Sequence, residues 1–306
     1  MKVNRRKALQ LGLSAAAVFP WSPVVVQADP ESSLKKNYFD KLAEYKSNYD
    51  KYRPVLDKAQ STGLELMDYH VHVMKGGKMT SDSVAEYQKY TGLKIGMVEN
   101  AGKAWLLSDN KKIAQYLDEA EKAAYKANPA KKAFQIGIQI NDRDWYSAIS
   151  PENLARLDYV LADTLVMMCP DGSPYPLWNL PADCAVDPEV WMKYYFAHCM
   201  AVLDEPLTIW ADPFYLPSFC RNQFAKLWTE DRVEALIAKA IRNQIAIEIQ
   251  GASPFPILPF IKSALKKGAK IVMGSNNFDD NPKPLDSWIT ILSSVSVKSS
   301  QLLALE

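Results

Sequence analysis

The sequence has little net charge and lacks the motifs of several common binding functions. Its 36 Lys and Arg nearly balance 35 Asp and Glu, which gives a formal charge of +1 at pH 7, and no basic stripe stands out. Nucleic-acid binding therefore has no electrostatic support. Neither a Gly-x-Gly-x-x-Gly nor a Gly-x-x-x-x-Gly-Lys-Ser/Thr pattern is present, which removes the usual evidence for a nucleotide-binding doubly wound sheet.

Cysteine and histidine are both scarce. The four cysteines, Cys169, Cys184, Cys199 and Cys220, show no Cys-x-x-Cys spacing, which disfavours a zinc finger. The sequence does not decide whether these cysteines form disulfides or are buried free thiols. Of the three histidines, His198 lies in an apolar helical segment and is interpreted as a core residue, whereas the other two stand two residues apart.

No stretch of the chain has the apolar length of a membrane span, and the mild apolar run near the N-terminus is interpreted as part of a signal. Arg5 and Arg6 precede this run, residues 9–19 form it, and residues 26–28 offer a cleavage site before Asp29. We therefore expect residues 1–28 to be a signal peptide. The adjacent arginines favour the twin-arginine route, in which the export machinery carries a folded chain, while an ordinary secretory signal stays open. The mature protein is expected to be soluble, periplasmic or secreted, and without stable membrane insertion.

The rest of the chain is predicted to form one α/β domain, because about 280 residues suit a single barrel. Residues 29–62 are predicted to be a helical segment before a domain at 63–306. Caps and apolar stripes predict helices at 83–90, 110–126, 229–241 and 260–267, and a long loop is expected at 164–190. Seven apolar segments, suited to strands buried on both faces, are predicted at 64–73, 94–99, 133–140, 157–163, 207–212, 245–250 and 270–274. This repeated β–α pattern favours a barrel or a doubly wound sheet.

The predicted strands end in polar side chains. In a barrel these ends meet at one mouth, where function collects, so polar residues at all seven ends are hard to explain by solubility alone. The candidates are His70, His72, Glu99, Asn100, Gln139, Asp163, Asp212, Glu248, Asn276 and Asn277.

His70 and His72 are the strongest of these candidates. Residues two apart on a strand point to the same face, here towards the barrel interior. Two imidazoles on one face suit a divalent transition metal such as zinc, manganese or iron. Two strand-end histidines that hydrogen-bond locally are the alternative interpretation.

The motifs together resemble the PHP family, the polymerase and histidinol phosphatase-like metal hydrolases, or an amidohydrolase-like relative. The similarity runs from about Leu66 to the C-terminus and rests on DYHVH (68–72), MVENAG (97–102), QINDRDW (139–145), DYVLAD (158–163), DPFYLP (212–217), LWTEDR (227–232), EIQ (248–250) and GSNN (274–277). The resemblance implies a distorted seven-stranded (β/α) TIM-like barrel, in agreement with the strand count.

The chain departs from the metal ligands that this resemblance implies. Only His70 and His72 match the family pattern outright, and acids or amides stand where other ligands are expected. The resemblance implies up to three metals, and these departures favour one, held by His70, His72 and a carboxylate such as Asp212, Asp163 or Glu99. Two histidines and one carboxylate leave positions open for water and substrate.

These residues predict a metal-dependent hydrolase of a small extracytoplasmic phosphoester, ester or amide. The metal would activate water, and Glu99 or Asp163 would act as the general base. Arg143 would grip an anionic group of the substrate, or else form a surface ion pair with a neighbouring aspartate. The residues expected to contact the substrate are Gln139, Glu248, Asn276 and Asn277.

A second interpretation is a degenerate barrel that binds a ligand without turnover. It rests on the amides Gln139, Asn276 and Asn277, because neutral amides are poor metal ligands and poor bases.

Overall fold

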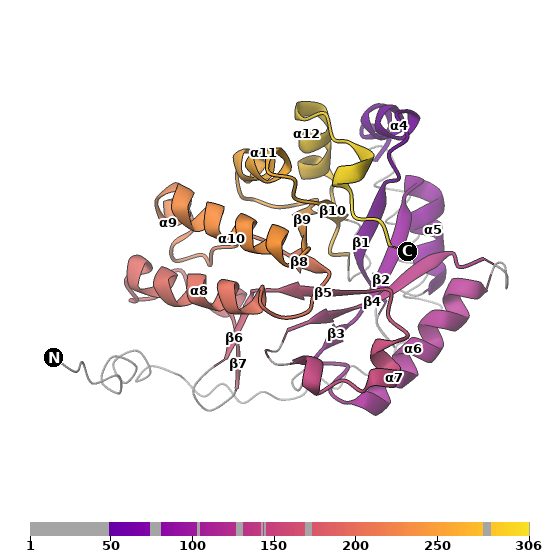
Figure 1. The fold of residues 1–306 in the computed structure, drawn as a ribbon, viewed down its shortest axis with the longest axis horizontal. Coiled ribbons are helices and arrows are strands. Elements are labelled where there is room, and N and C mark those ends of the chain that lie inside the picture. Colours follow the sequence, from indigo (N-terminus) through magenta and orange to yellow (C-terminus); the bar gives the residue numbers. More distant parts are fainter. Residues whose placement is uncertain are drawn as a thin grey trace.

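The chain forms a closed parallel β-barrel surrounded by helices (Figure 1). The computed structural model describes residues 49–73, 81–102, 105–126, 131–141, 143, 145–168, 173–277 and 283–305. The seven barrel strands are β1 (Met67–His72), β2 (Lys94–Val98), β4 (Phe134–Ile140), β5 (Tyr159–Asp163), β8 (Ile209–Ala211), β9 (Ala246–Gln250) and β10 (Ile271–Gly274). They lie in the order β2-β1-β10-β9-β8-β5-β4, and a parallel pairing of β2 with β4 closes the ring. The predicted seven-stranded (β/α) barrel is confirmed.

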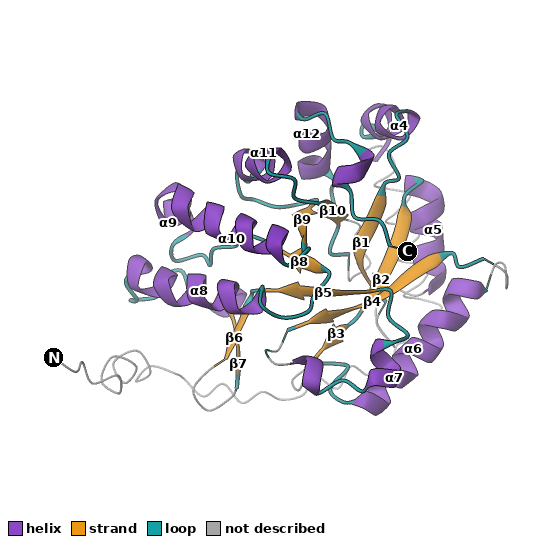
Figure 2. Cartoon of the chain, viewed as in Figure 1, coloured by secondary structure: helices purple, strands orange, loops and turns teal. Residues whose placement is uncertain are grey.

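Helices cover the outer face of the barrel, which explains why its strands are apolar on both faces (Figure 2). The helices are α4 (Arg53–Ser61), α5 (Ser81–Thr91), α6 (Asn110–Tyr125), α7 (Pro151–Leu154), α8 (Pro188–Val202), α9 (Phe224–Leu227), α10 (Glu230–Arg242), α11 (Leu258–Lys266) and α12 (Asp286–Ser294). Short 3₁₀ turns are η1 (Trp145–Ser147), η2 (Leu177–Asn179), η3 (Arg221–Gln223) and η4 (Ser299–Gln301). The side chain of Thr229 caps α10, as expected, by accepting a hydrogen bond from the backbone of Arg232 at 3.4 Å.

Two features lie outside the regular β–α repeat. The segment expected to be a long loop at 164–190 contains an antiparallel hairpin of β6 (Val166–Met168) and β7 (Pro174–Pro176). A two-residue strand, β3 (Asn100–Ala101), follows β2 and pairs with the carboxyl end of β4. With strands of two and three residues, neither feature is long enough to give a strand signal in the sequence.

The described part of the predicted N-terminal helical segment contains α4. This helix packs beside α12, and Figure 1 shows the two together. Just before α4, the hydroxyl of Tyr49 donates to the carbonyl of Lys283 at 2.6 Å, and that of Tyr52 donates to Asp286 at 3.0 Å. These bonds tie the segment to the last part of the barrel. The predicted signal at 1–28, and the segment up to residue 48, lie outside the described residues.

Apolar side chains fill the amino-terminal part of the barrel interior, which we call the barrel floor. Tyr159 occupies its centre, where its ring meets Tyr69 edge-on at 5.5 Å and its hydroxyl donates to the Tyr69 carbonyl at 2.7 Å. Gly96 and Gly137 leave room for this ring, since a Cβ atom on Gly137 would lie 2.6 Å from it. The floor consists of Met67, Tyr69, Val98, Tyr159, Leu161, Ile209, Ala211, Ala246 and Val272.

Cys184, Cys199 and Cys220 are free thiols, and Cys169 lies outside the described residues. Within the ranges that the structure describes, no helix combines the length and the apolar character needed to cross a membrane.

Candidate metal centre

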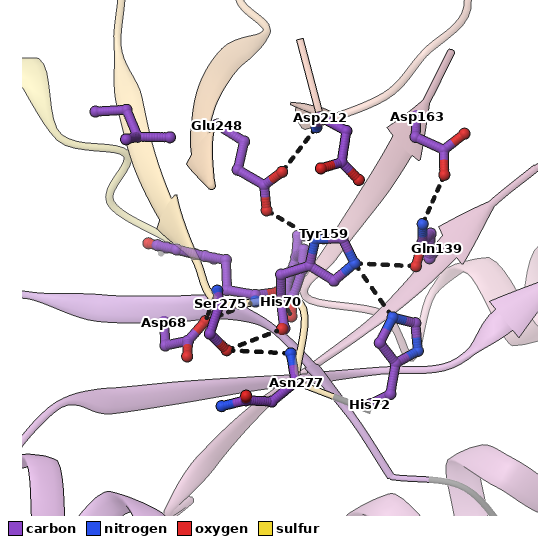
Figure 3. Close-up of polar contacts among 12 residues, drawn as sticks. Asp68, His70, His72, Gln139, Tyr159, Asp163, Asp212, Glu248, Ser275 and Asn277 are labelled. Carbon is purple, nitrogen blue, oxygen red and sulfur yellow. Dashed lines mark hydrogen bonds and ion pairs between the residues drawn. The ribbon is translucent and has the colours of Figure 1, made fainter. Parts of the chain in front are cut away.

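A β-bulge in β1 directs both histidines of the predicted pair into the barrel. Asp68 pairs with Ile95 and Val71 pairs with Met97, so β1 has one more residue than β2 between these points. Met67 and Tyr69 face the floor below the bulge, and His70 is re-aimed into the interior above it. Figure 3 shows His70 and His72 side by side, with their Nε2 atoms 3.2 Å apart.

Polar side chains from the other strands meet these histidines at the carboxyl end of the barrel. We call this set the polar mouth, and every member is buried. It consists of His70, His72, Glu99, Gln139, Asp163, Asp212 and Glu248.

His70, Asp212 and Glu248 form a group that could hold a metal ion, because each offers a ligand atom and these atoms lie within 4.8 Å of one another. The Nδ1 atom of His70 lies 2.7 Å from Oε1 of Glu248, and Oε2 of Glu248 accepts the backbone N–H of Asp212 at 2.8 Å (Figure 3). Asp212 has a φ of 44°, an unusual left-handed conformation for a residue other than glycine. Its Oδ2 atom is buried without a hydrogen-bond partner.

Gln139 and Asp163 form a second chain of contacts on the other side of His70. Oε1 of Gln139 lies 3.0 Å from Nε2 of His70, and its amide donates to Asp163 at 2.8 Å. The other oxygen of Asp163 accepts the backbone N–H of Leu165 at 2.9 Å. His70 therefore contacts an acceptor at each ring nitrogen, as a doubly protonated imidazolium requires.

Glu99 lies on the His72 side of the mouth. Its Oε1 atom is 3.7 Å from Nδ1 of His72 and accepts the backbone N–H of Asn100 at 2.8 Å, whereas its Oε2 atom is buried without a partner. The Asn100 amide lies 3.5 Å from Nδ1 of His72 and its oxygen accepts from Asn141 at 2.9 Å. The mouth thus holds two orphaned carboxylate oxygens, on Asp212 and Glu99.

The pKa values reflect four carboxyl groups crowded into a buried space. Burial lowers the pKa of His70, but the charge and hydrogen bond of Glu248, the charge of Asp212 and the Gln139 contact together outweigh burial and raise the pKa to about 9. Burial raises the pKa of Asp163 to about 6 and, together with the charge of Glu248, holds that of Asp212 well above its usual range. Burial lowers the pKa of His72. A bound divalent cation would offset this repulsion among carboxylates.

Two supporting residues, Asp68 and Gly274, were not expected from the sequence. Asp68 accepts the backbone N–H groups of His70 at 3.1 Å and Ser275 at 2.9 Å, and the Tyr87 hydroxyl at 3.1 Å. It therefore holds β1, β10 and α5 in register beneath the histidines. At Gly274, a Cβ atom would collide with the Glu248 carboxylate, so only glycine leaves room for the pair of Glu248 with His70. Asp68 stands two residues before His70, and an acid at that place was the available sequence signal.

The remaining predicted residues lie around the mouth or away from it. Asn277 is buried, and its side-chain oxygen accepts the backbone N–H of Lys283. Its backbone carbonyl accepts the N–H of His72 at 2.7 Å. Asn276 has a φ of 53° and, with Asp212, lines a cavity of about 110 Å³ next to the metal-ligand group. Arg143 joins none of these contacts: its Nε lies 3.7 Å from Glu205, and the aspartates expected beside it lie outside the described residues.

The fold and the site together define a class, a closed parallel (β/α) barrel with a buried His–Asp–Glu group at the carboxyl ends of its strands. A comparison with models of known protein families gives no match, and a comparison with curated proteins gives none either. The resemblance to the PHP family therefore stays an interpretation of the motifs.

Proposed function

We propose that this protein is a metal-dependent hydrolase that acts on a small phosphoester, ester or amide. The observation that carries the proposal is the buried group of His70, Asp212 and Glu248, in which Asp212 keeps an oxygen without a partner. Isolated buried carboxylates are costly, and metal coordination is one of the few arrangements that compensates them. One divalent ion, zinc, manganese or iron, suits a histidine and two carboxylates.

The donor set fits such an ion in its chemistry. The Glu248 carboxylate lies 2.7 Å from His70 Nδ1, so binding a cation through that nitrogen would require His70 to release a proton. His72 lies next to His70 and is the neutral histidine of the pair, since burial lowers its pKa. A bound ion would supply Lewis acidity and lower the pKa of a water molecule.

Asp163 is the best placed general base. Gln139 and the Leu165 N–H fix its two oxygens, and its pKa of about 6 lets it hold a proton briefly near neutral pH. Glu99 is the alternative base, because its Oε2 atom is unpaired beside His72. Asn276 lines the adjoining cavity of about 110 Å³ and would contact the substrate, while Gln139 would orient His70 and Asp163.

The test is a hydrolysis assay on phosphoester, ester and amide substrates, with zinc, manganese or iron added after chelation. We expect activity that requires the metal and falls by more than about a hundredfold in a His70→Ala/His72→Ala variant, since even supporting residues of metal sites cost 10–100-fold. The variant should keep the circular dichroism of the barrel. Unfolding of this variant would remove the argument that the pair serves function rather than structure.

A second function has its own supporting observation. Both ring nitrogens of His70 already contact acceptors, Glu248 and Gln139, so the polar mouth can satisfy His70 without any metal. This supports a barrel that binds a polar ligand without turnover. Under this alternative, no substrate of the panel is hydrolysed with any metal, and ligand-induced thermal stabilisation does not depend on added metal.

We further propose that the protein acts outside the cytoplasm, in the periplasm or after secretion. The support is the paired arginines and apolar run within residues 1–28, which lie outside the described residues.

A further inference from the structure

A second cavity, larger than the one beside Asp212, lies behind the barrel wall. It measures about 370 Å³, compared with about 110 Å³ for the other, and falls within the size range of small-molecule sites, roughly 300–1,000 Å³. Its walls come from the outer side of β3 and β4, from α6 and from η1. Figure 1 shows β3 and α6 on the lower right, away from α9 and α10.

Strand alternation separates this cavity from the polar mouth. Gln139 and Asn141 face the His70 and His72 side, and Ile140 between them lines the cavity. Likewise Asn100 contacts His72, and its neighbour Ala101 lines the cavity. The strand pair β3–β4 therefore stands as a wall between the two spaces, and the cavity is not part of the metal centre.

The cavity combines apolar walls with a few polar groups. Leu107, Ile113, Ile140 and Ile149 are all buried and form its apolar part. Trp145 also lines it, is 4% exposed, and has an indole N–H with no hydrogen-bond partner. This N–H is fully buried and out of reach of water, so Trp145 contributes the apolar face of its ring to the cavity.

Arg143 brings a positive charge to the same cavity. Its Nε lies 3.7 Å from Glu205, which is longer than a hydrogen bond, so this contact does not engage the fork of donors in the guanidinium. The acidic residue of the lining, Asp109, caps α6 by accepting the Lys112 N–H at 2.9 Å. Asp109 thus has a structural task, and Arg143 is the side chain suited to recognise a ligand.

We propose that this cavity is a binding site for a small amphipathic carboxylate, such as an arylacetate or a medium-chain fatty acid. The apolar body packs against Ile113, Ile140, Ile149 and the Trp145 ring, and the carboxylate accepts from Arg143. Apolar enclosure with a few placed polar groups is the usual character of such sites. The proposal does not depend on a metal at the polar mouth or on the proposed hydrolysis.

Calorimetric titration with phenylacetate and with its neutral analogue phenylacetamide tests the charge requirement. We expect phenylacetate to bind at least about tenfold more tightly, because a charge-assisted bond to arginine is stronger than a neutral one. Arg143→Gln should remove this preference, leaving the affinity for phenylacetamide unchanged. Arg242→Gln, an exposed substitution at the end of α10, is the matched control and should bind both probes as the unaltered protein does.

Two further measurements locate the site. Ala148→Trp, which adds a ring at the exposed edge of the cavity, should abolish binding of both probes. The indole N–H resonance of Trp145, assigned with Trp145→Phe, should move on addition of phenylacetate in the unaltered protein. The proposal is overturned if phenylacetate binds no better than phenylacetamide, if Arg143→Gln keeps the preference, or if neither probe binds at about 10 mM, well above the affinities of small-molecule sites.

Discussion

The barrel floor and the polar mouth are built from the same strands, yet they act on stability in opposite directions. At the floor, Tyr159 fills space that Gly96 and Gly137 leave open, and it satisfies its hydroxyl on Tyr69. At the mouth, towards the carboxyl ends of the strands, Asp163 and Asp212 have raised pKa values because they are buried near other carboxylates. A site that is costly in this way supports the proposal of a functional rather than a structural role.

The largest expected effect is at the floor. Tyr159→Ala should lower the free energy of unfolding by about 3–5 kcal/mol, the usual cost of removing a buried aromatic ring, since Gly96 and Gly137 offer no side chain to refill the space. Urea denaturation measures this loss. Tyr159→Phe is the control, because it keeps the ring and removes one hydrogen bond, worth about 1 kcal/mol. A loss below about 1 kcal/mol for the alanine variant would contradict the role given to the ring.

The second prediction concerns Asp163, where a substitution should raise the free energy of unfolding rather than lower it. Its pKa in the folded protein, about 6, lies above the ordinary 3.8, so the folded state holds this proton more tightly and loses stability as pH rises from about 4 to 6. Asparagine does not titrate. Asp163→Asn should therefore be more stable than the unaltered, chelated protein above pH ~6, by up to about 3 kcal/mol.

Urea denaturation in the presence of a chelator, at pH values near 4 and near 7.5, tests this predicted gain in the free energy of unfolding. The difference between Asp163→Asn and the unaltered protein should be largest at the higher pH and should nearly vanish at the lower one. A difference of equal size at both would mean that the Asp163 carboxyl is not strained by burial.

The smallest expected effect lies outside both regions. Thr229→Ala removes the cap of α10 and should cost about 1 kcal/mol of unfolding free energy, measured by the same denaturation. Thr229→Ser should restore most of it, since the hydroxyl is the capping group. Because α10 covers the outer face of the barrel, neither variant should alter metal content, and a change in metal content would show that the outer helices are coupled to the mouth.

The sequence predicted the barrel well because its strands are buried on both faces. The apolar run at 245–250, for example, became β9 (Ala246–Gln250) within one residue of its predicted start. The two-residue β3 and the three-residue strands β6 and β7 are too short to give such a signal and were missed. Periodicity reports burial, so it finds strands that the core requires and not those that loops add.

The candidate site was predicted only in part, because a sequence does not say which strand ends face each other. His70 and Asp212 were expected as ligands, whereas Glu248 was expected to contact substrate and instead lies in the group that could hold a metal. Glu248 on β9 can reach His70 on β1 because only β10 lies between these strands. Gly274 on β10 has no side chain to block the contact. The bulge in β1, which aims His70, also has no sequence signal.

The metal content of the protein, purified without chelators and measured by elemental mass spectrometry, tests the central claim most directly. We expect about one zinc, manganese or iron per chain, as three protein ligands provide for one ion. Asp212→Asn should lose it, because an amide is a poor ligand at a position where the carboxylate oxygen has no other partner, while Thr229→Ala should keep it. A protein without metal even after incubation with each ion, or an Asp212→Asn variant with unchanged metal content, would contradict the account.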